Sequence, residues 1–180
     1  MRFHRLSCCL VAVWTVIAAL PRAAADEPDR GPTPAVAIAV RLPITGTRDT
    51  QVEAAILRQL ERLRSNPRER GVLVLQFDAS DEEGALASDF GRSLELARFL
   101  SDGRLAGIKT VAFLPEGVQG HAVLVALACE EIVMAPDAVL GPANADEPNV
   151  DDAMRAAYRQ VAARRKTVPT AVAVALVDPA

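Results

Sequence analysis

Short apolar runs alternate with segments of helical periodicity along most of the chain. The runs are four to eight residues long, which is the length typical of buried strands. They predict strands at residues 35–42, 71–77, 109–114 and 131–134. Segments with an apolar face on a polar background predict helices at residues 50–63, 90–100 and 149–165, and a nearly continuous apolar segment predicts a buried helix at residues 121–129.

This alternation predicts an α/β fold with parallel strands and right-handed crossovers. Continuous apolar strands indicate that helices cover both faces of the sheet. The helix at residues 121–129 has almost no polar side chain, so we expect it at the centre of the molecule. Residues 26–34 are polar and rich in proline, and they predict a linker. The remaining residues, 35–180, predict one domain.

The first 25 residues have the layout of a secretory signal peptide. A basic start at Arg2 and Arg5 precedes the apolar run Leu6–Leu20, and small residues at 23–25 precede Asp26. We therefore expect an exported protein, periplasmic or secreted. The alternative is an uncleaved anchor, so membrane association would come only through this N-terminus or through a membrane protein partner.

Composition narrows the function classes. Aromatic residues make up only 4% of the chain, which favours a core of small aliphatic side chains over a large aromatic-lined pocket. Cleavage after residue 25 would leave 17 Lys and Arg residues against 23 Asp and Glu residues, a net charge of −6. This charge argues against nucleic acid as a partner. Only Cys129 and His121 would remain of their kinds, so we expect neither a disulfide, nor a Cys/His metal site, nor a cofactor.

The segment Ile108–Ala143 carries a longer pattern. A strand, a turn and an alanine-rich helix are followed by Glu130-Glu131-Ile132-Val133-Met134-Ala135-Pro136 and by Gly141. This order resembles the signature of the ClpP/crotonase superfamily, in its NfeD-like branch of membrane-associated serine proteases. The strands VAIAVRLPITG and GVLVLQFD and the closing AVALVDPA are similar to other parts of the family, so the resemblance covers residues 35–180.

The resemblance implies a fold of repeated β-β-α and β-α-β units, with a mostly parallel sheet covered by helices. It also implies a homo-oligomer. Family members often continue into transmembrane helices and a small β-barrel, so a free-standing domain and a truncated chain both stay open.

The resemblance further implies a serine nucleophile at the N-terminus of the central helix, where backbone N–H groups would stabilise an oxyanion. Counting back from Met134-Ala135-Pro136 places that serine at Gly120, which has no nucleophilic atom. The implied oxyanion and substrate pocket comprises Gly84, Gly120, His121 and Ala122. The family's general base, a lysine about forty residues further on, would fall near Lys166.

His121 is the residue with two open interpretations. It can act as a general base that activates water or a loop serine, Ser80 or Ser88. It can equally be a structural histidine that packs on the turn. We expect Cys129 and Tyr158 to be packing residues, and Asp151 and Asp152 to cap a helix.

Two function classes follow from these residues. The first is a non-proteolytic, degenerate ClpP-fold module that binds a peptide or a protein partner. The second is an active serine-type hydrolase with a relocated site around His121. An enoyl-CoA hydratase of the same superfamily is a third class, but export argues against it because coenzyme A is cytoplasmic.

Overall fold

The computed structural model describes residues 33–79, 87–145, 147 and 149–178. The predicted signal peptide, most of the predicted linker, and the candidates Ser80 and Gly84 lie outside the described residues. The strands are β1 (Ala35–Arg41), β2 (Gly71–Asp78), β3 (Ile108–Leu114), β4 (Gly117–Val118), β5 (Glu131–Met134) and β6 (Val139–Leu140). The helices are α1 (Arg48–Leu63), α2 (Phe90–Leu100), α3 (Val123–Leu127), α4 (Asp152–Arg165) and α5 (Thr170–Val177), with 3-10 turns η1 (Gly103–Leu105) and η2 (Gly120–Ala122).

The main sheet is parallel, as the alternation of elements predicts. Its four strands lie in the order β1-β2-β3-β5, and β4 and β6 form a separate parallel pair. Each neighbour in the main sheet is reached through a helical crossover, which parallel pairing requires. The α/β prediction is therefore confirmed, with element ends that differ from the predicted ones by a few residues.

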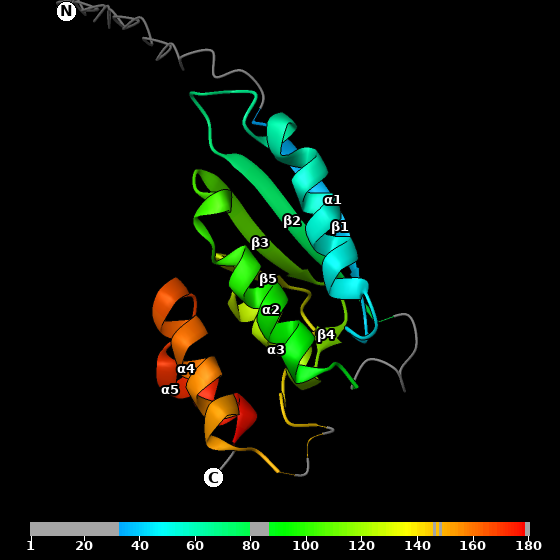
Figure 1. Ribbon diagram of the computed structural model, residues 1–180, viewed down its shortest axis with the longest axis vertical. Coiled ribbons are helices and arrows are strands. Elements are labelled where there is room, and N and C mark those ends of the chain that lie inside the picture. The colour runs from blue at the N-terminus through cyan, green and yellow to red at the C-terminus, as the bar shows by residue number, and fades with distance from the viewer. Residues whose placement is uncertain (1–32, 80–86, 146, 148, 179–180) are drawn as a thin grey trace, which may run out of the picture.

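Helices α1, α2 and α3 cover one face of the main sheet (Figure 1). That face presents Val40, Leu73, Leu75, Phe77 and Ala112, all buried in the core. On the opposite face Ala35, Ala37 and Ala39 of β1 are exposed, and so is Val133 of β5. The prediction that helices cover both faces is thus wrong for the described residues. Alanine counts as apolar in a sequence pattern, yet its small side chain tolerates exposure.

The ends of the helices follow ordinary capping rules. The side chain of Asp89 accepts a hydrogen bond from the Arg92 N–H at the start of α2, and Asp151 accepts one from the Met154 N–H at the start of α4. The Asp151 cap confirms the sequence prediction. Helices α4 and α5 pack as a pair beside α2 and α3 (Figure 1), and so they close one side of the core.

The central helix is confirmed as central but is shorter than predicted. Every residue from Val123 to Cys129 is completely buried, and α2 and α4 pack against α3. The helix begins two residues late, because residues 120–122 form the 3-10 turn η2 instead of an α-helical turn. Full burial of each Val or Leu here contributes roughly 1.5 to 3 kcal/mol of hydrophobic stabilisation. This packing fixes the position of both ends of α3.

Candidate functional site

The candidate site lies at the N-terminal end of α3, which we call the helix tip (Gly120–Ala122). The chain leaves β3 at its carboxyl end, passes through β4 and turns into η2. The carboxyl edge of a parallel sheet is where ligands of α/β proteins usually bind. The helix tip therefore stands where a site is expected from topology alone.

Gly120 makes the sharp entry into the helix. Its φ of 62° lies in the left-handed region, which a residue with a Cβ adopts only at a cost. Its N–H donates to the Pro142 carbonyl at 2.9 Å. Gly120 and Ala122 are both buried, and neither side chain carries a nucleophilic atom. The implied pocket residues Gly120, His121 and Ala122 are thus contiguous at the tip.

His121 is buried directly at the tip. Only 5% of the residue is exposed, and the Phe90 ring packs edge-on against the imidazole with 5.1 Å between ring centroids. The imidazole Nδ1 lies 3.4 Å from the Tyr158 hydroxyl. Its Nε2 lies 3.7 Å from the Glu147 Oε2, a distance that suits an ion pair better than a hydrogen bond.

Tyr158 is a packing residue, as the sequence predicts, and its hydroxyl also lies near the His121 imidazole. It is fully buried on α4, and burial raises the pKa of its phenol, so the hydroxyl stays protonated. The hydroxyl and the His121 Nδ1 can exchange the roles of donor and acceptor with the imidazole tautomer. The signal that could have identified it is the helical spacing of Ala157, Tyr158, Val161 and Ala162, the buried residues of α4.

Ser88 is engaged elsewhere. It is buried, and its Oγ accepts a hydrogen bond of 2.9 Å from the Ile44 N–H. The neighbouring Asp89 N–H donates to the Ile44 carbonyl at 3.1 Å. These two bonds hold the loop after β1 against the start of α2. Ser88 therefore has a structural role, because its hydroxyl is bonded to the loop after β1.

Lys166 lies at the opposite end of α3 from His121. It is the exposed C-cap of α4, with a left-handed φ of 61°. The next residue, Thr167, donates its hydroxyl to the Cys129 carbonyl just past the end of α3. The structure does not bring Lys166 to the helix tip. Lys166 has the sequence separation from Gly120 that the family's lysine base would have. The direction of α4 nevertheless places Lys166 far from the helix tip.

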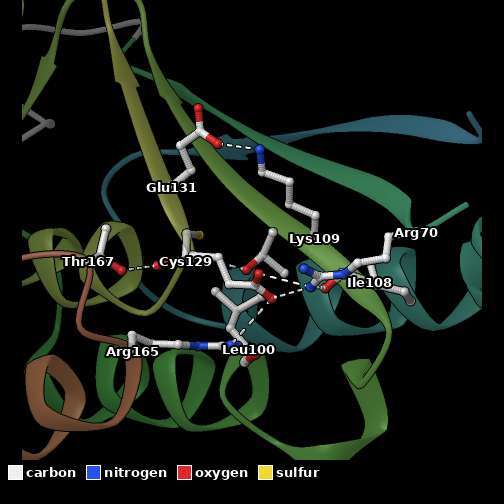
Figure 2. Close-up of polar contacts among 10 residues, drawn as sticks. Arg70, Leu100, Ile108, Lys109, Cys129, Glu131, Arg165 and Thr167 are labelled. Carbon is white, nitrogen blue, oxygen red and sulfur yellow. Dashed lines mark hydrogen bonds and ion pairs between the residues drawn. The ribbon is translucent and has the colours of Figure 1, made fainter.

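The far end of α3 carries a different kind of chemistry. Glu130 accepts two hydrogen bonds of 2.9 Å from the Arg70 guanidinium, and its Oε1 lies 3.7 Å from Arg165. Figure 2 shows Arg70 and Arg165 in this region, with Arg165 also donating to the Leu100 carbonyl. We call Arg70, Glu130 and Arg165 the tail cluster. Each member has an opposite charge or a carbonyl within reach, which identifies the cluster as a structural clamp.

Cys129 belongs to the same end. It is fully buried, its thiol donates to the Val125 carbonyl at 3.6 Å, and burial raises its pKa to about 12. A thiol in this state is inert, which confirms the expectation of core filling.

Within the described ranges, no three His, Cys, Asp or Glu side chains gather closely enough to hold a metal ion. In the same residues no helix is both long and apolar enough to cross a membrane.

Comparison with known proteins gives a fold and no family. No family model matches this chain, and no curated protein matches it. Solved structures do match, among them two of the 1510-N membrane-bound stomatin-specific protease. One is a serine-to-alanine variant, with 11% identity and a TM-score of 0.57 over 81% of this chain and 69% of that one. The other is a lysine-to-alanine variant in complex with a substrate peptide, with 13% identity and a TM-score of 0.58 over 81% and 65%. At this identity the likeness establishes a ClpP-like protease fold and nothing finer.

Proposed function

We propose that this chain is an exported, NfeD-like domain with a ClpP fold that binds a peptide or protein segment without cleaving it. The observation that carries the proposal is the glycine at the helix tip. The sequence signature assigns the family's serine to Gly120, and a hydrogen atom there cannot form an acyl-enzyme. The position of Lys166 at the other end of α3 also supports the absence of cleavage chemistry, because no lysine base faces the tip from α4.

The tip keeps features that suit binding. The η2 turn at Gly120 places the start of a buried helix at the carboxyl edge of the sheet. One of the solved structures with this fold holds a substrate peptide. A ClpP-fold domain that has lost cleavage chemistry can retain peptide binding, because extended peptides bind largely through backbone hydrogen bonds and side-chain pockets.

Unfolded casein provides a direct test. Fluorescein-labelled casein is titrated with the purified full chain and followed by fluorescence anisotropy, while a gel follows its length. We expect saturable binding with casein intact after prolonged incubation. Gly120→Ala adds a Cβ at the tip and should weaken binding, whereas Gly103→Ala, an exposed glycine in η1, should not. Casein fragments, or no binding at all, would contradict the proposal.

A second function has one observation in its favour. The approach of the Glu147 carboxylate to the His121 imidazole at 3.7 Å supplies the orienting carboxylate that a histidine base needs. A hydrolase at this tip would pair His121 with a loop serine, Ser80 or Ser88. A fluorophosphonate probe separates the two functions. Labelling of the wild-type chain that disappears in His121→Ala would establish the hydrolase and refute the binding module.

Export is tested separately from binding. The residues that carry it are the basic start, the apolar run and the small residues before Asp26. Expression of the full chain in a bacterium, followed by N-terminal sequencing of the periplasmic fraction, should return a protein that begins at Asp26. Recovery of the chain in the membrane fraction with Met1 intact would show that the N-terminal segment is an uncleaved anchor and not a signal peptide.

A further inference from the structure

The strand β5 ends the main sheet and has an open edge. Among the described residues its only strand partner is β3, and the remaining edge carries unpaired backbone groups. Natural edge strands are usually guarded by lysine, proline or a charge in mid-strand. In β5 the one charge is Glu131 at the first position, and Lys109 of β3 is its ion-pair partner (Figure 2). The rest of the strand, Ile132 to Met134, has no charged residue or proline that would oppose edge pairing.

Apolar surface accompanies this edge. Val133 is 41% exposed and Met134 is 39% exposed, and they belong to opposite faces of the strand. A groove runs along the same edge between β5 and the residues that join α4 to α5. Its apolar lining is Ile132, Met134, Leu140 and Val168. Unpaired backbone hydrogen-bonding groups therefore lie beside solvent-exposed apolar side chains.

The side-chain pattern of β5 is complementary to itself. Ile132 and Met134 belong to the helix-covered face, and Glu131 and Val133 belong to the open face. A two-fold axis through Val133, perpendicular to the sheet, would pair β5 with β5 of a second copy in antiparallel fashion. This register sets Val133 opposite Val133 and Ile132 opposite Met134 of the second copy, so both central rows are apolar.

Charge selects this register over its neighbours. With the axis at Val133 the two Glu131 side chains stand at opposite ends of the paired segment, about 13 Å apart at the usual rise per residue, which exceeds the Debye length of about 8 Å in physiological salt. An axis at Ile132 would instead set Glu131 opposite Val133 and Glu130 opposite Met134. An axis at Met134 would bring Pro136, which has no N–H, into the ladder.

We propose that β5 is the interface between two copies of this chain, paired antiparallel about Val133 into one continuous sheet of eight strands. The proposal concerns a surface distinct from the helix tip, so it stands whether or not the tip binds peptide. The pairing buries Val133 and places Met134 of the second copy in the groove beside Ile132.

Sedimentation velocity of the full chain tests the proposal. We expect a dimer for the wild type, and a monomer for Val133→Lys, because the axis would then hold two like charges in contact. Leu57→Lys is the matched control. Leu57 is 42% exposed on α1, away from β5, and its variant should stay dimeric. A wild-type monomer, or a Val133→Lys variant that is still a dimer, would contradict the proposed interface. A wild-type chain that stays monomeric and binds only another protein would contradict it as well.

A cross-linking experiment tests the register of the paired strands, and it does not depend on a lysine variant that could fail to fold. Residues directly opposite each other in an antiparallel pair have Cα atoms about 4.5 to 5.5 Å apart, which is within the range of a disulfide. Val133→Cys oxidised with copper phenanthroline should give a covalent dimer, in which two thiols lose two electrons and two protons to the oxidant. Leu57→Cys should give no more dimer than the wild type, whose own cysteines set the background. Equal cross-linking of the two variants would contradict pairing at Val133.

Discussion

The two ends of helix α3 have opposite characters. At the C-terminal end, the tail cluster gives every charged side chain a counter-charge or a carbonyl, and Cys129 is inert. At the N-terminal end, the helix tip has a glycine in a left-handed conformation and a buried imidazole that contacts Tyr158 through a long hydrogen bond. The tail thus holds the helix in place. The tip instead combines a buried polar side chain with a backbone turn that suits glycine and disfavours other residues.

The largest effect should come from removing the charge at the centre of the tail cluster. Glu130→Ala leaves the guanidinium groups of Arg70 and Arg165 without their carboxylate, and Arg165 is only 16% exposed. We expect a loss of about 2 kcal/mol in the free energy of unfolding, because hydrogen bonds to charged groups contribute about 1.5 to 3 kcal/mol and Glu130 is only partly buried. Urea denaturation followed by circular dichroism measures it.

Glu95→Ala is the control for that loss. It removes the exposed ion pair with Arg98 on α2, and such surface pairs contribute about 0 to 1 kcal/mol. Equal losses in the two variants would mean that the tail cluster does not anchor α3.

The next effect tests the left-handed turn at Gly120. Gly120→Ala forces a Cβ into a φ of 62° and should reduce the free energy of unfolding by about 1 to 2 kcal/mol. Gly103→Ala has open space around its Cβ and should be neutral or slightly stabilising. The comparison fails if both alanine variants unfold at the same urea concentration.

A smaller effect compares one hydroxyl at each end. Thr167→Val removes the donor to the Cys129 carbonyl at 2.5 Å, and Tyr158→Phe removes the hydroxyl 3.4 Å from the His121 Nδ1. We expect a loss of about 1 kcal/mol for the threonine and less for the tyrosine, because the shorter bond is the stronger one. Thermal unfolding of the two variants side by side gives the order, and a larger loss for Tyr158→Phe would reverse our view of which end is held more firmly.

The smallest effect concerns Cys129. With its pKa raised to about 12 and no exposure, the thiol should not react with a maleimide at pH 8 in the native chain. Peptide mass mapping should find this cysteine labelled only after denaturation. Labelling of the native chain at the rate of a free thiol would show that the tail opens readily.

The sequence predicted the fold better than the site. The ranges 90–100 and 131–134 match α2 and β5 residue for residue, because α2 has helical periodicity that ends before Asp102-Gly103 and β5 is a short apolar run that ends before Ala135-Pro136. The two-residue strands β4 and β6 carry too few residues for a pattern to register. The site depends on contacts across 26 and 37 positions, from His121 to Glu147 and to Tyr158, and no local pattern encodes such contacts. The family signature assigned Gly120 to the tip, but it could not give the direction of α4, which decides where Lys166 lies.

Two backbone hydrogen bonds connect the helix tip to the last helix. The Gly120 N–H donates to the Pro142 carbonyl, and the next amide, of Ala143, donates to the Leu176 carbonyl of α5. Any displacement of the tip would therefore reach α5 through these two bonds. An environment-sensitive dye on Val172→Cys, at a position that is 46% exposed on that helix, would turn the route into an optical readout that leaves every residue of the tip unaltered.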